Sequence, residues 1–256
     1  MSVETQIKAE LEALEKREGL KVLYACESGS RAWGFPSTDS DYDVRFLYVR
    51  PIDWYLSVQP RRDVVECEMK GLLDISGWDL QKALRLLYKS NPPLLEWLRS
   101  PIVYLKQSSA LERLRTVAGS YFSPRSSIHH YLHMAEGNYR EYLQGEEVRL
   151  KKYFYVLRPL LACSWIERTG EMAPMEFHRL VESELPTGEL KAGVMALLER
   201  KMASQELDLG PRIQVVNDYI EDRLATLKTN ADKAPKPRVS YDALDELFRA
   251  VVREVY

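Results

Sequence analysis

Residues 27–49 have the sequence ESGSRAWGFPSTDSDYDVRFLYV, and the fold prediction starts from this stretch. A Gly-Ser-Arg turn at residues 29–31 opens it, and the alternating, partly β-branched and aromatic run 42–49 predicts a strand at its end. Three acidic residues stand at alternate positions just before and inside that strand, namely Asp39, Asp41 and Asp43. Like charges at this spacing repel one another, so the crowding indicates a positively charged partner among them.

The aspartates are first interpreted as a metal site. Residues two apart in a strand point to the same face, so Asp41 and Asp43 project together. With a third carboxylate they form an oxygen-rich pocket suited to one or two Mg²⁺ ions, with Mn²⁺ as the alternative. Asp74, in the strand-like run LLDISGW, is the candidate third ligand, whereas Asp79 precedes an apolar helix and favours a helix cap. The alternative is a solvated turn that caps itself through Asx hydrogen bonds.

The turn before the aspartates has the composition of an anion cradle. Gly29 and Ser30 in a tight turn after a strand offer backbone N–H groups and one O–H group to an anion. Arg31 adds a guanidinium fork that matches phosphate oxygens. A phosphate cradle next to a metal clamp indicates phosphoryl or nucleotidyl transfer. The sequence contains neither GxxxxGK[ST] nor GxGxxG, which excludes a P-loop or kinase-type phosphotransferase.

These motifs resemble the polymerase-β-like nucleotidyltransferase superfamily. Its signature is an apolar residue, Gly and then Gly or Ser, a spacer, and alternating acidic and apolar residues; here GS, ten further residues and DYDV follow this order. Ser28 departs from it, because an apolar residue is expected there. The later LDI around Asp74 resembles the third acidic element. The runs GSRAWGFPSTDSDYDVRFLYV and DISGWDLQKALRLLYKSNPPLLEWLRSPIVY resemble the branch of predicted nucleotidyltransferases that includes the RNA-ligase-associated proteins of RNA repair.

The resemblance implies a role for each element of the motif. Gly29 and Ser30 are expected to contact the triphosphate of a nucleotide. Asp41, Asp43 and Asp74 are expected to hold the divalent metal and are the predicted catalytic residues. The same resemblance implies a mixed sheet flanked by helices.

The rest of the chain predicts an α+β architecture. At 256 residues, 45% of them hydrophobic, the chain can bury a substantial core. Periodicity and turn residues predict helices and strands that alternate irregularly in the first half, with a helix at 2–17, strands at 21–26, 42–49, 64–69, 72–78 and 102–105, and helices that begin at Asp79 and Asn91. The second half predicts helices at 123–143, 147–168, 175–182, 190–206, 211–227 and 240–256, with a linker at 229–239 and no confident strand. The expected domains are a nucleotidyltransferase catalytic domain at 1–106 and an all-α domain at 107–256 that closes over the nucleotide.

One helix of the second half carries cations at helical spacing. Lys151, Tyr155 and Arg158 fall on one face, and Lys152 lies beside it. The helix looks like the one that offers cations to the nucleotide in related two-domain nucleotidyltransferases, so Lys152, Tyr155 and Arg158 are expected to bind the nucleotide. A solvated cationic face is the alternative.

Composition limits the partners of the protein. The net charge of −2 excludes a generally basic nucleic-acid coat, so an anionic substrate needs local Lys and Arg clusters. The three cysteines suggest no disulfide framework, and no apolar run approaches the ~18 residues of a membrane span. A reducing cytoplasm is therefore the expected compartment, without a membrane partner.

Two smaller patterns each have two interpretations. His129 and His133 have the i, i+4 spacing of helical zinc ligands, next to His130, but no supporting cysteine pair or HExxH glutamate accompanies them. Packing or a contact to substrate is therefore favoured for these histidines. Trp33 and Phe35 either pack beneath the loop or stack on a base.

The predicted activity is a Mg²⁺-dependent transfer of a nucleoside monophosphate from a nucleoside triphosphate, with ATP as the expected donor, to an acceptor hydroxyl, with release of pyrophosphate. An RNA 3′ end in RNA repair is one candidate acceptor, and Arg45, Arg61 and Arg62 are either cations along such a strand or surface charges. Protein and small-molecule acceptors stay open, as do nucleobase preference and oligomeric state. The alternative is a catalytically silent nucleotide- or RNA-binding module on the same fold.

Overall fold

The computed structural model describes residues 2–107, 109–203 and 209–256, and the chain divides into two compact units. Unit 1 consists of Met1–Ala32, Asp41–Tyr121 and Arg238–Tyr256, and unit 2 consists of Trp33–Ser40 and Phe122–Pro237. This division differs from the predicted boundary after residue 106. The helices α5 (Ala110–Tyr121) and α11 (Asp242–Val255) both belong to unit 1, where they contact each other.

Unit 1 is built on a mixed sheet. Its strands are β1 (Lys21–Glu27), β2 (Tyr42–Val49), β3 (Val64–Glu66), β4 (Leu73–Asp79) and β5 (Val103–Lys106), in the order β3-β4-β2-β1-β5. The β2–β4 pair is parallel and the other pairs are antiparallel. The parallel pair sets the first residues of β2 and β4 side by side at one end of the sheet.

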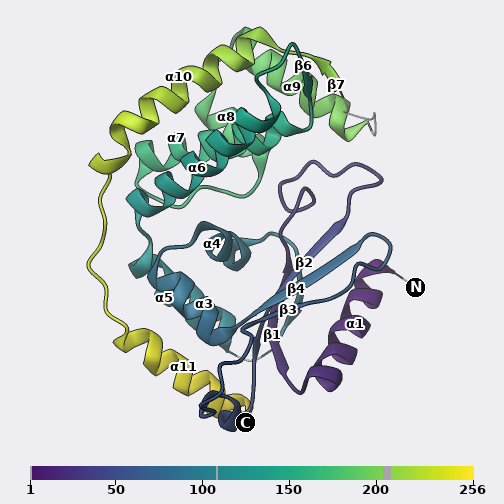
Figure 1. Cartoon of the computed structure of the whole chain (residues 1–256), viewed down its shortest axis with the longest axis vertical. Coiled ribbons are helices and arrows are strands. Elements are labelled where there is room, and N and C mark those ends of the chain that lie inside the picture. The colour runs from purple at the N-terminus through teal and green to yellow at the C-terminus, as the bar shows by residue number, and fades with distance from the viewer. Residues whose placement is uncertain (1, 108, 204–208) are drawn as a thin grey trace. The chain divides into compact units, whose positions relative to one another are not determined.

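Helices cover both faces of this sheet (Figure 1). On one face lies α1 (Val3–Glu18), whose Ile7, Leu11 and Leu14 are buried against sheet residues such as Phe46. On the other face lie α3 (Leu80–Tyr88), α4 (Pro92–Arg99) and α5. The short helix α2 (Ile52–Tyr55) follows β2. The predicted α+β class, with a mixed sheet flanked by helices, is confirmed.

Local capping explains where several of these helices begin. The Asp79 carboxylate accepts the Gln81 N–H at 2.8 Å and caps α3, and the Asn91 side chain accepts the Leu94 N–H at 3.1 Å and caps α4. Both caps satisfy backbone donors that the first helical turn leaves unpaired. The two predicted helix starts are confirmed.

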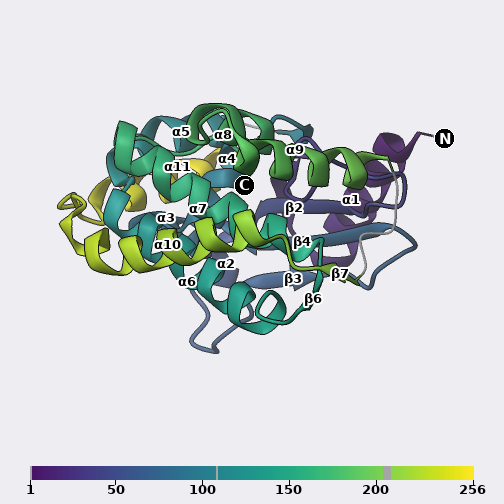
Figure 2. The ribbon, with the colours of Figure 1, turned by 90° about the horizontal axis from the view of Figure 1, so that it is seen from above.

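Unit 2 is largely helical. Its helices are α6 (Pro124–Tyr142), α7 (Lys152–Thr169), α8 (Phe177–Glu184), α9 (Glu189–Met202) and α10 (Gln214–Asn230), followed by the 3₁₀ turn η1 (Ala231–Lys233). The helix α7 forms the centre of the unit, because most of its residues are buried. It contacts α6, α8 and α10. Two short strands, β6 (Glu147–Arg149) and β7 (Leu209–Pro211), pair side by side (Figure 2).

The structure corrects three element predictions in the second half. The expected helix over 147–168 begins only at Lys152, because residues 147–149 pair with β7 instead. The prediction that no strand follows residue 106 is also wrong, because β6 and β7 pair although they are distant in the sequence. Gly210 allows this pairing, since the Leu150 side chain packs directly on its Cα. The helix α5 had no predicted counterpart. Residues 204–206 of the helix expected at 190–206 lie outside the described residues.

The loop that joins the Gly-Ser-Arg turn to β2 belongs to unit 2. Phe35 is buried there between Phe154 and Phe177, with ring centroids 4.9 and 5.5 Å away. The Phe177 N–H donates to the Trp33 carbonyl at 2.8 Å. Of the two interpretations of Phe35, packing therefore holds, because its ring is enclosed by other aromatic rings. In the described part of the chain, no helix has both the length and the apolar character that a membrane span requires.

Candidate active site

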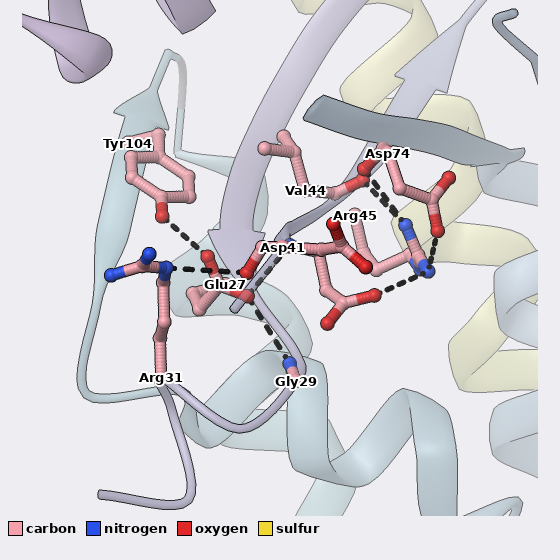
Figure 3. A network of polar contacts seen from close by, with 9 residues as sticks. Glu27, Gly29, Arg31, Asp41, Val44, Arg45, Asp74 and Tyr104 are labelled. Carbon is pink, nitrogen blue, oxygen red and sulfur yellow. Dashed lines mark hydrogen bonds and ion pairs between the residues drawn. The ribbon is translucent and has the colours of Figure 1, made fainter. Parts of the chain in front are cut away.

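Two of the predicted acids face each other across the parallel strand pair. Asp43 on β2 is in register with Asp74 on β4, and one Arg45 nitrogen, Nη2, donates to both: to Asp43 Oδ1 at 3.2 Å and to Asp74 Oδ2 at 2.7 Å (Figure 3). The Asp43 and Asp74 side chains are 30% and 41% exposed, so the pair is open to solvent. Arg45 is therefore the positively charged partner that the crowded aspartates indicated.

Asp41 lies one residue before β2 and is exposed. Its backbone carbonyl accepts a hydrogen bond from Arg31 Nε at 3.2 Å (Figure 3). The Arg31 guanidinium lies 3.7 Å from the centre of the Tyr42 ring. Asp39, the first of the three alternating aspartates, belongs to unit 2. The loop that begins with the Gly-Ser-Arg turn is thus tied to the start of β2 through Arg31.

The structure separates Asp79 from these acids. Asp79 is in register with Tyr48, toward the other end of the parallel pair, and its carboxylate caps α3 and accepts the Tyr55 hydroxyl at 2.8 Å. Burial raises the pKa of Asp79 to about 6. Of the two candidates for a third acidic ligand, Asp74 is the one that lies beside Asp43.

Gly29 lies against the carboxylate of Asp43. A Cβ at this position would stand 1.7 Å from Asp43 Oδ2, far inside contact distance. The neighbouring Ser28 N–H donates to the Asp43 carbonyl at 2.9 Å. Ser30 follows in the turn and is half-buried. The predicted phosphate turn and the predicted acid strand are therefore packed directly on each other, with glycine as the residue that permits it.

A buried carboxylate that the sequence analysis did not single out lies under this turn. Glu27 ends β1 and has no solvent exposure. Its Oε1 accepts the Gly29 N–H at 3.2 Å and the Asp43 N–H at 2.9 Å, and its Oε2 accepts the Tyr104 hydroxyl at 2.5 Å (Figure 3). The only available signal was an acidic residue that directly continues the apolar run KVLYAC of the predicted strand.

The local electrostatics are those of crowded carboxylates. The pKa of Asp43 is raised, first by burial and further by the negative charges of Glu27, Asp74 and Asp41, while Arg45 opposes the shift. An additional positive charge would therefore be stabilised here.

The donor chemistry of the site fits a hard divalent cation, because the carboxylates of Asp41, Asp43 and Asp74 offer only oxygen. Within the described ranges, however, no three His, Cys, Asp or Glu side chains are arranged to hold a metal ion. Arg45 bridges Asp43 and Asp74 instead. A cation could take this position only in exchange for part of the Arg45 bridge.

Lys152, Tyr155 and Arg158, the three residues of α7 that were predicted to bind the nucleotide, lie in different environments. The Lys152 ammonium lies over the Tyr142 and Tyr155 rings, 4.0 and 4.9 Å from their centres, and burial followed by the nearby Lys151 lowers the pKa of Lys152. Tyr155 is 44% exposed. Arg158, in contrast, is buried, and its Nε donates to the Met175 carbonyl at 3.3 Å. Lys152 and Tyr155 therefore lie together near the surface, whereas the Arg158 side chain lies in the interior of unit 2.

Arg158 and the histidines make contacts within unit 2. The Arg158 guanidinium lies 4.8 Å from the Trp33 ring centre. His129 Nε2 lies 3.0 Å from Asp232 Oδ1, and its ring is 6.4 Å from that of His133. These contacts give the His129 side chain a carboxylate partner on η1.

The strand–turn–strand unit with paired acids on a mixed sheet has the arrangement expected from the resemblance to nucleotidyltransferases, and comparison with known proteins identifies the family. Residues 3–250 match the model of a family described as the RNA repair pathway DNA polymerase beta family. The chain belongs to this family, and the predicted relationship to polymerase-β-like nucleotidyltransferases is confirmed.

Two similar proteins are a sequence relative and a solved structure. The chain is 50% identical over 249 residues to the uncharacterized protein YcgL of Bacillus subtilis (strain 168), covering 96% of this chain and 95% of the relative. A crystal structure of a nucleotidyltransferase-like protein from Exiguobacterium sibiricum 255-15 aligns with a TM-score of 0.34 and 15% identity, covering 97% of this chain and 80% of that one. A likeness at that TM-score adds nothing to the family assignment.

Proposed function

We propose that the protein is a metal-dependent nucleotidyltransferase that moves a nucleoside monophosphate from a nucleoside triphosphate to an acceptor hydroxyl and releases pyrophosphate. One observation carries the proposal: Asp43 and Asp74 are in register on parallel strands, and Asp43 lies directly against Gly29 of the turn. Family membership supports nucleotidyl transfer as the reaction class. ATP is the donor to test first.

Asp41, Asp43 and Asp74 are the proposed holders of one or two Mg²⁺ ions, with Mn²⁺ as the alternative. When bound there, such ions would neutralise phosphate charge and lower the pKa of the acceptor hydroxyl. If a cation were bound there, Arg45 would have to give up at least one of its two carboxylate bonds. Its Nη1 already donates to the carbonyls of Val44 and Asp74, both at 3.1 Å, so the guanidinium has a second anchor beside the site.

The residues of the turn have distinct proposed roles toward the triphosphate. The Gly29 N–H already donates to Glu27, so Gly29 contributes chiefly through its lack of a side chain. The Ser30 hydroxyl and the Arg31 guanidinium are the groups proposed to steady the β- and γ-phosphates. The Arg31 side chain contacts the Asp41 carbonyl and the Tyr42 ring.

Residues of α7 are also proposed to bind a nucleotide. Lys152 has an ammonium held over two tyrosine rings, and a phosphate group would compete favourably for that charge because the aromatic contact is weaker than an ion pair. Tyr155 offers an exposed ring for a base. Arg158 is proposed to act on the nucleotide only through the aromatic ring of Trp33, since its own side chain is buried.

An RNA 3′ end is the proposed acceptor, because the matching family is described by a role in RNA repair. A second candidate function is a nucleotide- or RNA-binding module without turnover. The Arg45 bridge favours this second candidate, because a guanidinium already neutralises the acid pair that would otherwise need a metal.

The test is a label-transfer assay. The protein is incubated with each α-³²P nucleoside triphosphate, with Mg²⁺ or Mn²⁺, and with RNA and DNA strands that carry a free or a blocked 3′ hydroxyl, together with protein acceptors. The expected result is labelled RNA only when the 3′ hydroxyl is free, with pyrophosphate released in equal amount.

The matched variants are Asp43→Asn and Asp53→Asn, the latter an exposed acid on α2 of the same unit. Asp43→Asn is expected to lose at least about a hundredfold in rate, as the loss of one charged group in a transfer site typically does, and Asp53→Asn is expected to lose none. Full activity in Asp43→Asn would contradict the proposal. Nucleotide binding without pyrophosphate release on any acceptor would support the binding module.

A further inference from the structure

Glu27 is a charged group in an unusual place. A glutamate is rarely fully buried, because taking an ionised carboxylate out of water is costly unless hydrogen bonds replace the lost hydration. Glu27 has no exposure, yet its two oxygens accept three hydrogen bonds, from Gly29, Asp43 and Tyr104. The proposed reaction assigns no role to this carboxylate. A carboxylate retained at this cost indicates a specific task.

The hydrogen bonds reveal what the carboxylate joins. A single oxygen, Oε1, accepts the N–H of Gly29 in the turn and the N–H of Asp43 in the acid strand. The two halves of the motif are therefore fixed to the same atom. Because a Cβ at Gly29 would overlap the Asp43 carboxylate, the turn and the strand have almost no freedom to approach further.

The other side of Glu27 is anchored to β5 and the segment before it. Oε2 accepts the hydroxyl of Tyr104 on β5 at 2.5 Å. The Glu27 N–H donates to the Ile102 carbonyl at 3.0 Å, and the Glu27 carbonyl accepts the Ser100 hydroxyl at 2.6 Å. Backbone and side chain are thus both restrained, so the position of Oε1 is set by the sheet and not by the mobile end of a flexible side chain.

These contacts also exclude a direct role in the reaction. Both oxygens of Glu27 are engaged with donors inside unit 1, and the side chain does not reach solvent, so it cannot touch a substrate. Its influence on the site passes through the backbone of Gly29 and Asp43.

We infer that Glu27 is a positioning residue, whose buried carboxylate sets the distance between the phosphate turn at Gly29 and the acid strand at Asp43. The effect of Glu27 on catalysis rests on the proposed nucleotidyl transfer, whereas its hydrogen bonds to the Gly29 and Asp43 amides do not depend on that proposal. An error of about 1 Å between reacting groups can cost roughly a hundredfold in rate, so a group that fixes this distance matters to the reaction.

The test compares three variants of the full chain. Glu27→Leu removes both acceptors and keeps an apolar side chain in the site. Glu27→Gln keeps one carbonyl oxygen for the two amides, and its NH₂ group can donate to the oxygen of Tyr104. The matched control, Tyr104→Phe, deletes a bond to the same carboxylate but leaves the bonds to Gly29 and Asp43.

The first measurement is amide hydrogen exchange without nucleotide. Hydrogen bonds to charged acceptors are about twice as strong as neutral ones, so Glu27→Leu is expected to speed exchange at Gly29 and Asp43 by at least about tenfold. Glu27→Gln is expected to speed it by about threefold, and Tyr104→Phe by less than about twofold. If circular dichroism shows that Glu27→Leu is unfolded, the test is whether exchange at Gly29 and Asp43 is faster in Glu27→Gln than in Tyr104→Phe. Wild-type exchange at both amides in the folded Glu27 variants would overturn the inference.

The second measurement is the kinetics of label transfer. Glu27→Leu is expected to lower kcat about a hundredfold with KM for the nucleotide changed by less than about threefold, and Glu27→Gln to recover most of the rate. A Glu27→Leu enzyme with wild-type kcat would overturn the catalytic part. If exchange changes as expected while even the wild-type protein transfers no label, the proposed function fails and the placement of the two amides by Glu27 stands.

Discussion

The replacement Gly29→Ala tests the contact on which the site is built. The new Cβ would stand 1.7 Å from Asp43 Oδ2 and 2.6 Å from Asp43 Cγ, whereas ordinary contacts begin at 3.4 Å. The two groups must therefore move apart by about 1.7 Å. Gly29 is not among the residues with positive φ, so alanine brings no backbone strain and the effect is purely one of contact.

Two magnitudes follow from this overlap. Overpacking in a close-packed region costs about 1–3 kcal/mol, and that range is expected for the loss in free energy of unfolding. A displacement of the Asp43 carboxylate by more than 1 Å is expected to lower kcat/KM by at least about a hundredfold. The variant should therefore stay folded, because domains are stable by about 5–15 kcal/mol, while its kcat/KM falls by at least about a hundredfold.

The assay is label transfer from an α-³²P nucleotide together with urea denaturation. The matched control is Gly119→Ala on α5 of the same unit, where an added Cβ meets no described atom within 4 Å. This control is expected to keep full activity and to gain up to about 1 kcal/mol in stability, since alanine favours a helix over glycine. A Gly29→Ala enzyme with more than about a tenth of wild-type kcat/KM would refute the reasoning.

Three further predictions concern stability and cation binding. Burial raises the pKa of Asp79 to about 6 in the folded chain, so the stability that its protonated form contributes is present below about pH 4 and is lost as pH rises through 6. The unfolding free energy of wild type minus that of Asp79→Asn should therefore fall by up to about 3 kcal/mol between these limits. A difference that stays constant with pH in urea titrations would contradict this. Phe35→Ala should destabilise unit 2 by about 3–5 kcal/mol in calorimetry, because it empties a buried aromatic site, and a loss below about 1 kcal/mol would mean that the loop is not anchored there. Arg45→Met should make the melting temperature respond more strongly to saturating Mg²⁺ than in wild type, since Asp43 and Asp74 then face each other without a cation, and an equal response would argue against a shared position.

Much of the fold could be predicted because its signals are local. The strand β2, the caps Asp79 and Asn91, and the buried face of α1 each depend on neighbours within a few residues. The pairing of β6 with β7 and the inclusion of α5 and α11 in unit 1 depend on contacts between distant segments, which no local pattern encodes.

The site was predictable to a similar extent. Asp74 could be named as a partner of Asp43 because the LDI run resembles the third acidic element of the family. The register that sets Asp43 beside Asp74 joins distant segments, and only the structure shows it. Glu27 was missed because it ends an apolar strand and its partners come from the turn, from β2 and from β5. The burial of Arg158 was missed because helical spacing identifies a shared face but not which face is covered.

Equilibrium binding of Mn²⁺, followed by electron paramagnetic resonance with a non-hydrolysable nucleotide present, tests most directly whether the acids on β2 and β4 form a cation site. The proposal predicts that Asp74→Asn weakens Mn²⁺ binding by at least about tenfold, since one of few oxygen ligands loses its charge, while Asp79→Asn, a change at the helix cap, leaves it unaltered. Equal Mn²⁺ affinity in wild type and Asp74→Asn would contradict the metal-dependent mechanism.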